Sequence, residues 1–172
     1  MAILRGTSYN DKPVRDAVKE FYKTHFDILL EETPHELKII DLTGVTDTEL
    51  GVEVEGGKWT GNFWTNDAYS LISGQEFRTI NIPIRKEKYW LEEYVRYGKT
   101  RYNPSYLKNT FVRSNKDFTQ FIVIRSETIR DQNKLIRTRF QPNNSNELED
   151  WLSFKKEDVE TYNLINGTWV LE

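Results

Sequence analysis

The spacing of apolar residues changes after residue 34, and this change constrains the fold more than any other feature of the chain. In residues 11–31 (DKPVRDAVKEFYKTHFDILLE), apolar side chains recur every three or four positions, which predicts an amphipathic helix. Asp11 followed by Pro13 is typical of a helix start, and Pro34 predicts the end. The later segments have the shorter period of strands. We therefore expect a sheet with this helix packed against it.

Two pairs of strands are predicted from turn signals and apolar runs. Residues 35–42 and 49–55 flank the turn-prone segment 43–48, which indicates a β-hairpin. Residues 109–129 indicate two strands around a Ser-Asn-Lys-Asp turn. Within them, the run FIVI at 121–124 is apolar on both faces, as expected for a strand in the middle of a sheet.

The remaining segments complete a fold of the α/β (α+β) class. Residues 78–90 alternate isoleucines on one face up to Ile84, although Pro83 favours an edge strand or a bulge. Three other segments are predicted to be a short helix, a loop and a helical stretch: 66–72, 97–106 and 155–165. At 172 residues the chain has the usual size of one domain, so we expect residues 1–172 to form a single domain with a mixed sheet of about five strands flanked by helices.

The net charge of -3 hides a strongly uneven distribution along the chain. Residues 1–77 carry 7 Lys and Arg against 14 Asp and Glu, and residues 140–172 carry 2 against 7, whereas residues 78–139 carry 15 against 6. Several tyrosines lie among the central cations. A basic segment interleaved with aromatic residues suits the phosphate backbone and bases of a nucleic acid. The alternative is that these cations pair with the acidic segments within the fold.

The stretch LGVEVEGGKW, residues 50–59, places two glutamates on one face of a predicted strand. Because side chains alternate in a strand, Glu53 and Glu55 project together, about 7 Å apart, and Val52 and Val54 project the other way. With a turn at 44–48, we expect Asp41 roughly opposite Gly51 and diagonal to Glu53.

Three converging carboxylates would suit a divalent cation. Oxygen ligands are those that Mg²⁺ prefers, and Mn²⁺ accepts the same set. A metal held by Asp41, Glu53 and Glu55 would activate water for hydrolysis of a phosphodiester. A solvated strand face with no ligand is the other interpretation.

The order of helix, strand with Asp41, turn, and Glu53-Val54-Glu55 in an apolar strand resembles the PD-(D/E)XK, or restriction-endonuclease-like, nuclease superfamily. The resemblance covers about residues 11–90. It implies a mixed sheet flanked by helices, with Asp41 and Glu53 as metal ligands and Glu55 at the position of the usual lysine. Glu20, in the first helix, corresponds to a glutamate that some members carry there.

Two departures from the family pattern affect the expected chemistry. No proline precedes Asp41, and the triplet ends in glutamate, as it does in some restriction enzymes of the superfamily. The lysine must then come from elsewhere or be unnecessary. Lys58 and Lys86 are the candidates to orient or deprotonate a water, and Lys86 is expected in the strand that follows.

The function predicted from these features is a Mg²⁺-dependent endonuclease acting on DNA rather than RNA. The residues expected to contact the nucleic-acid backbone are Arg85, Lys86, Lys88, Arg96, Lys99 and Arg101. Cleavage of a duplex favours a homodimer, because one domain cuts one strand at a time. Two alternatives stay open: a non-catalytic nucleic-acid-binding module that uses residues 78–139, and a structural or protein-interaction domain whose charged segments pair internally.

Composition limits the compartment. The chain has no cysteine and no apolar run long enough to cross a membrane, and the segment MAILRGTSYNDK lacks the apolar core of a secretory signal. We therefore expect a cytoplasmic protein with no membrane contact.

Overall fold

A computed structural model describes residues 8–34, 40–65, 78–103, 105–131, 136–140 and 149–172. Its centre is a seven-stranded sheet in which every neighbouring pair is antiparallel except β3 and β7, which are parallel. The strand order is β1 (Leu30–Glu32), β2 (Leu42–Gly44), β3 (Gly51–Gly56), β7 (Thr110–Ser114), β8 (Gln120–Ile124), β11 (Glu160–Ile165) and β12 (Thr168–Leu171). The expected mixed sheet is confirmed.

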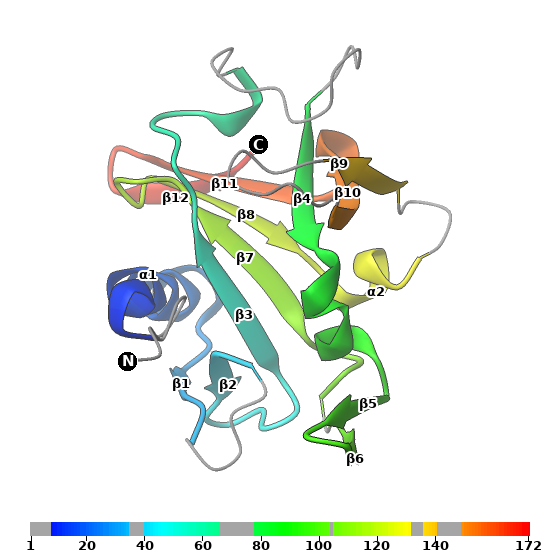
Figure 1. Ribbon diagram of the computed structural model, residues 1–172. Helices are drawn as coiled ribbons and strands as arrows, with labels where there is room; N and C mark the ends of the chain where they lie inside the picture. The colour runs from blue at the N-terminus through cyan, green and yellow to red at the C-terminus, as the bar shows by residue number, and fades with distance from the viewer. Residues whose placement is uncertain (1–7, 35–39, 66–77, 104, 132–135, 141–148) are drawn as a thin grey trace.

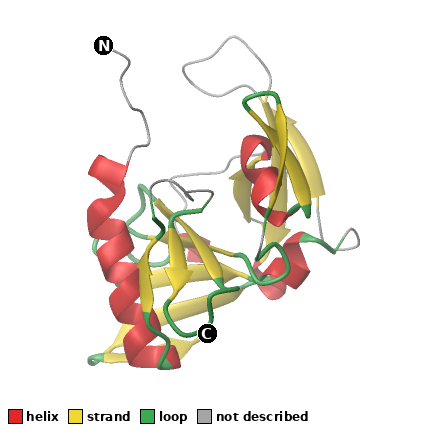
Figure 2. Ribbon diagram, turned by 90° about the horizontal axis from the view of Figure 1, so that it is seen from below, coloured by secondary structure: helices red, strands yellow, loops and turns green. Residues whose placement is uncertain are grey.

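The N-terminal helix lies on one face of this main sheet, beside β3 (Figures 1 and 2). Helix α1 (Ser8–Phe21) continues as a π-helical turn, η1 (Tyr22–Phe26), so the expected helix ends five residues earlier than position 31. Asp27 ends it by adopting a left-handed conformation, φ 56°, while its N–H donates to the carbonyl oxygen of Tyr22. The chain then enters β1 at Leu30.

The β2–β3 hairpin forms as expected, but its first strand is short. Of the predicted strand 35–42, residues 35–39 lie outside the described residues, and Asp41 comes immediately before β2. Asp47 shapes the turn by accepting the backbone N–H of Glu49. Gly44 is required, because a Cβ there would lie 2.2 Å from the carbonyl oxygen of Asp47.

A second sheet covers the other face of the main sheet. It has the order β4 (Thr79–Pro83), β10 (Glu149–Lys155) and β9 (Ile136–Phe140), all antiparallel. Strand β4 is at the edge, as Pro83 predicted. The prediction that the strand continues through Ile84 is wrong, because the chain turns at Pro83 into a 3-10 helix, η4 (Ile84–Trp90).

Two further predictions from local sequence are wrong. Residues 97–102 of the expected loop at 97–106 belong to a hairpin of β5 (Glu93–Arg96) and β6 (Lys99–Tyr102). The expected helical stretch at 155–165 is instead the end of β10, a short 3-10 turn η5 (Lys156–Asp158) and strand β11. The expected sheet of about five strands was too small, because the main sheet has seven. The two remaining short elements are η3 (Phe63–Thr65) and α2 (Ser126–Ile129), and the predicted helix at 66–72 lies outside the described residues.

The main sheet separates two apolar cores. Val18 and Phe21 of α1 pack with Phe121 and Val123 on one face, whereas Ile122 and its neighbours on the opposite face pack with the second sheet. Strand β8 is therefore apolar on both faces and lies inside the sheet, as predicted. In the described part of the chain, no helix is long and apolar enough to cross a membrane.

Candidate functional site: a carboxylate and lysine cluster under the second sheet

The two glutamates of β3 occupy one face of the strand, as predicted. Val52 and Val54 belong to the core under α1, and Glu53 and Glu55 project to the opposite face. That face is covered by the second sheet and η4. Glu53 is buried and Glu55 half-buried, so the expectation of an open, solvated strand face does not hold for Glu53.

Asp41 meets Glu53 more directly than expected. Because Leu42 pairs with Val52, Asp41 comes next to Glu53 rather than opposite Gly51. The turn is centred one residue later than predicted, because the N–H of Gly44 donates to the carbonyl oxygen of Leu50 at 3.0 Å, and this shift sets the register. One Asp41 carboxylate oxygen accepts the backbone N–H of Val54 at 3.0 Å, and the Asp41 carboxylate is close enough to Glu53 to raise the pKa of that carboxyl.

Lys86 joins the two glutamates. Its Nζ lies 3.2 Å from Oε2 of Glu53 and 3.1 Å from Oε2 of Glu55, and its side chain is only 15% exposed. It reaches them from η4, not from a strand as expected. Of the two lysines considered for the missing position of the motif, the structure brings Lys86 to the carboxylates, whereas Lys58 is exposed beyond the end of β3.

Arg113 completes the cluster and was not anticipated from the sequence. It lies in β7, directly beside Glu55 in the parallel pair, and its guanidinium is 2.8 Å from Oε1 of Glu55 and 2.7 Å from the carbonyl oxygen of Asn81. The only local signal was a single charged residue in the predicted strand TFVRS. Recognising its partner required knowledge of the β3–β7 pairing.

The side chain of Phe111 forms an apolar wall of the cluster. Lys86 Nζ lies 5.7 Å and Arg113 Cζ 5.3 Å from the centre of its ring, both within the range of cation–π attraction. The cations are thus held by an aromatic face as well as by carboxylates.

The two glutamates have opposite protonation tendencies. Burial raises the pKa of Glu53 well above its ordinary value, and the neighbouring Asp41 raises it further. Burial would also raise the pKa of Glu55, but Arg113 and Lys86 outweigh it and hold that pKa below its ordinary value. Burial disfavours the charge of Lys86, yet the glutamates raise its pKa overall. Glu53 is therefore the carboxyl that most readily holds a proton, and ionised Glu55 keeps Lys86 charged.

Glu20, the helix residue suggested by the family resemblance, is not brought to the cluster. It is exposed on α1, where it accepts a hydrogen bond from the hydroxyl of Thr24. Helix α1 packs on the face of the sheet that carries Val52 and Val54, opposite to the glutamates. The sheet itself therefore separates Glu20 from Glu53.

The carboxylates of Asp41, Glu53 and Glu55 are of the ligand type that a hard divalent cation prefers, but their arrangement suits such a cation only in part. Among the described residues, no three Asp, Glu, His or Cys side chains are placed so as to hold a metal ion. Lys86 and Arg113 engage the two oxygens of Glu55. Asp41 and Glu53 remain as an adjoining pair. Two carboxylates suffice for Mg²⁺ when waters and substrate phosphate oxygens supply the other ligands.

The predicted nucleic-acid contacts fall into two groups. Lys86 points inward, to the carboxylates. Arg85 and Lys88 are exposed on η4, and Lys99 and Arg101 are exposed on the β5–β6 hairpin. Arg96 is the backbone partner of Lys99 across this hairpin. The exposed cations thus lie on one continuous segment that begins at η4.

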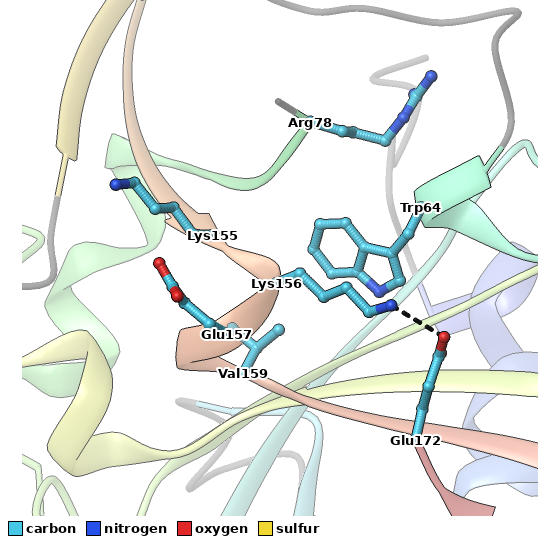
Figure 3. Close-up of a pocket in the computed structure, with 7 residues that line it drawn as sticks. All are labelled: Trp64, Arg78, Lys155, Lys156, Glu157, Val159 and Glu172. Carbon is cyan, nitrogen blue, oxygen red and sulfur yellow. Dashed lines mark hydrogen bonds and ion pairs between the residues drawn. The ribbon is translucent and has the colours of Figure 1, made fainter. Parts of the chain in front are cut away.

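A hollow of about 670 Å³ lies elsewhere, where η5 and the last residue meet η3 (Figure 3). It is lined by Trp64, Arg78, Lys155, Lys156, Glu157, Val159 and Glu172. The ammonium of Lys156 is paired with the carboxylate of Glu172 at 2.9 Å, and the indole N–H of Trp64 donates to the hydroxyl of Thr161. None of the predicted catalytic or metal-binding residues lines this hollow.

In comparisons with known proteins, no family model matches the chain, and no curated protein matches it significantly.

Proposed function

We propose that the protein is a Mg²⁺-dependent endonuclease that hydrolyses phosphodiester bonds of DNA, with Asp41 and Glu53 as the metal-binding carboxylates. The observation that carries the proposal is the meeting of three side chains from separate segments: Asp41 before β2, Glu53 in β3 and Lys86 in η4. An acidic pair with a lysine beside it is the set that the resemblance to restriction-endonuclease-like nucleases implies.

The order of elements around the cluster supports a restriction-endonuclease-like fold. A helix precedes an antiparallel hairpin, with Asp41 just before its first strand and Glu53 in its second, within a mixed sheet. The resemblance stated from residues 11–90 implies this order. The segment between β3 and β7 contains the second sheet's edge strand and η4, and η4 supplies the lysine that the Glu53-Val54-Glu55 triplet lacks.

The residues of the chain have distinct parts in the proposed reaction. A bound metal supplies an activated water and offsets charge on the phosphate. Asp41 is held in place by the N–H of Val54, which fixes one ligand before the metal arrives. To hold the metal, Glu53 would be ionised and would exchange its contact with Lys86 for the metal. The raised pKa of Lys86 means that it donates hydrogen bonds and offsets negative charge, so it does not remove a proton from water.

A second candidate function is favoured by the same contacts. Lys86 and Arg113 together neutralise Glu53 and Glu55, which is also what an internal ion-pair cluster joining two sheets would require. In that case the cluster is structural, and the basic segment either binds nucleic acid without cutting it or serves a protein contact.

Incubation of the purified protein with supercoiled plasmid, with and without Mg²⁺ or Mn²⁺, separates these functions. We expect metal-dependent nicking that falls at least a hundredfold in Asp41→Asn and Glu53→Gln. The matched control is Glu127→Gln, which removes an exposed carboxylate on α2 and should leave nicking unchanged. Circular dichroism melts confirm that each variant is folded.

Calorimetric titration with Mg²⁺ tests the metal site without substrate. Binding by the wild type that is lost in Asp41→Asn supports the nuclease. Folded protein that shows neither metal binding nor nicking would leave the structural cluster as the explanation. Light scattering with and without DNA tests the homodimer that cleavage of both strands would favour.

A further inference from the structure

We propose that the β5–β6 hairpin is a preformed β-ribbon that enters the major groove of duplex DNA, with Tyr97 at its tip. This inference deepens the proposed function and rests on DNA being its substrate. It assigns the duplex contact to one element whose position, charge and exposure are set by the fold.

The hairpin projects from the body of the molecule (Figure 1). Within the described parts of the chain, β5 and β6 pair only with each other and form a separate two-stranded sheet. A two-stranded ribbon is one of the two elements that fit the major groove, which is about 12 Å wide. The unpaired outer edges of both strands leave the ribbon narrow enough for such a groove.

The base of the hairpin is anchored, so the ribbon keeps a defined direction. Trp90, just before β5, is buried and donates its indole N–H to the carbonyl oxygen of Asn109 at 3.0 Å. Tyr94 is buried as well. The N–H of Asn103, just after β6, donates to the carbonyl oxygen of Glu92 at 3.0 Å and closes the base. A preorganised element loses less conformational entropy on binding.

The hairpin exposes large apolar side chains from its base to its tip. Tyr97 is 88% exposed, Val95 70% and Tyr102 67%, the three highest values among the large hydrophobic residues that the structure describes. Tyr97 and Gly98 form the two-residue turn, both with positive φ, 53° and 73°. This turn matches the twist of the strands and holds the Tyr97 side chain at the tip. Exposed apolar groups gathered in one element mark a contact surface.

The charge of the surrounding chain selects a polyanion as the partner. The hairpin carries Arg96, Lys99 and Arg101. Its acidic residues, Glu92 and Glu93, lie at the base, and beyond them the sequence has no Asp or Glu from Tyr94 to Lys116. Arg96 and Lys99 are cross-strand partners next to the turn. Cations along a ribbon can contact phosphates on either side of a groove, while the tip reaches the base edges.

The position of the hairpin also suits the carboxylate cluster. Helix η4, which carries Lys86, runs directly into β5. The chain from Lys86 to Tyr97 can span at most about 30 Å, allowing about 2 Å per residue in η4 and about 3.3 Å per residue beyond it. One turn of duplex DNA is about 34 Å. The ribbon can therefore occupy a groove within one turn of a phosphate at the cluster.

Fluorescence anisotropy with a labelled 20-base-pair duplex in EDTA tests the proposal without requiring cleavage. The double variant Lys99→Ala with Arg101→Ala should reduce the slope of log K against log salt by about 2. Tyr97→Ala should weaken duplex binding roughly tenfold and leave that slope unchanged. The matched control, Lys23→Ala with Lys116→Ala, removes two exposed cations outside the hairpin and should change the affinity by less than threefold.

Three results would overturn the proposal. One is duplex binding by the hairpin variants that equals that of the control. Another is a wild-type protein that binds the corresponding single strand more tightly than the duplex. The third is a change of molecular mass in Tyr97→Ala by light scattering, with unchanged DNA affinity, which would make the hairpin a contact between copies of the chain. Because EDTA removes the metal, hairpin-dependent binding without plasmid nicking would overturn only the proposed catalysis.

Discussion

The two faces of strand β3 come from the same six residues but are buried in different ways, one against apolar side chains and the other against charged ones. On one face, Val52 and Val54 pack under α1 in an apolar core. On the other, Glu53 and Glu55 are covered by the second sheet and matched with Lys86 and Arg113. The apolar face needs only shape and volume from its neighbours. The charged face needs specific partners in specific places, because an unmatched buried charge is costly.

The two faces should therefore differ in how well they tolerate substitutions of buried residues. Hydrophobic burial is non-directional, so conservative exchanges under α1 should be absorbed by repacking. The cluster on the other face has no such freedom, since removal of one cation leaves a carboxylate buried without compensation. The following predictions test the contrast, beginning with the largest effect.

Removing a large aromatic side chain from the α1 face should have the greatest effect on stability. Phe121 is fully buried, and its ring centre lies 4.7 Å from that of Phe21. We expect Phe121→Ala to lower the free energy of unfolding by about 4 kcal/mol, from lost transfer energy and the cavity left behind. Urea denaturation measures it, with Ile165→Ala, at an exposed position of β11, as the control. A loss below 1 kcal/mol would mean that this face is not tightly packed.

Removing one charge from the opposite face should cost nearly as much. We expect Lys86→Ala to lower the free energy of unfolding by about 3 kcal/mol, because Glu53 and Glu55 lose the cation between them. Lys88→Ala, an exposed lysine on the same helix, should change it by less than about 0.5 kcal/mol. If Lys86→Ala changes the free energy of unfolding as little as Lys88→Ala does, the carboxylates are solvated and the two faces of β3 do not differ in this way.

The pH dependence of stability should identify Glu53 as the strained member of the cluster. Its pKa is raised in the folded state, so the folded protein binds the proton more tightly than the unfolded chain. Stability should therefore fall as pH rises above the ordinary value of 4.5 and until the raised pKa is passed, by at most about 1.4 kcal/mol per pH unit. Glu53→Gln should lack this fall.

Glu55 has the opposite sign and gives an internal control for that experiment. Its lowered pKa contributes stability that is present above 4.5 and is lost as pH falls through the folded value. Thermal melts of the wild type, Glu53→Gln and Glu55→Gln across pH 3 to 8 separate the two windows. If the stability of Glu53→Gln falls with pH above 5 in the same way as that of the wild type, a group other than Glu53 causes the fall.

The smallest effect on stability is expected at the hairpin tip. Tyr97→Ala should change the free energy of unfolding by less than about 0.5 kcal/mol, since the side chain is 88% exposed. Thermal denaturation provides the measurement. A loss above 1 kcal/mol would mean that Tyr97 packs within the fold, and its effect on DNA affinity would then not be evidence of a direct contact.

Predictions from local sequence were correct where the spacing of apolar residues along the chain matched the faces that are buried in the fold. The helix over 11–26, the position of FIVI inside the sheet and the shared face of Glu53 and Glu55 follow from periodicity alone. The failure at 155–165 has a physical cause. Residues 160–163 pair with β8 and residues 162–165 with β12, and this pairing overrides a weak local preference for helix.

The candidate site likewise has a part that could be predicted from local sequence and a part that could not. The helix, the alternation of β3 and the carboxylates that share one face of it follow from the order of residues, because backbone geometry projects neighbouring residues to known sides. The partners of these carboxylates become known only from the packing of distant segments. The parallel pairing of β3 with β7 places Arg113 beside Glu55, 58 positions away in the chain, and the turn at Pro83 directs Lys86 to both glutamates. Such partners depend on long-range chain closure, which leaves no periodic signal in a local stretch of sequence.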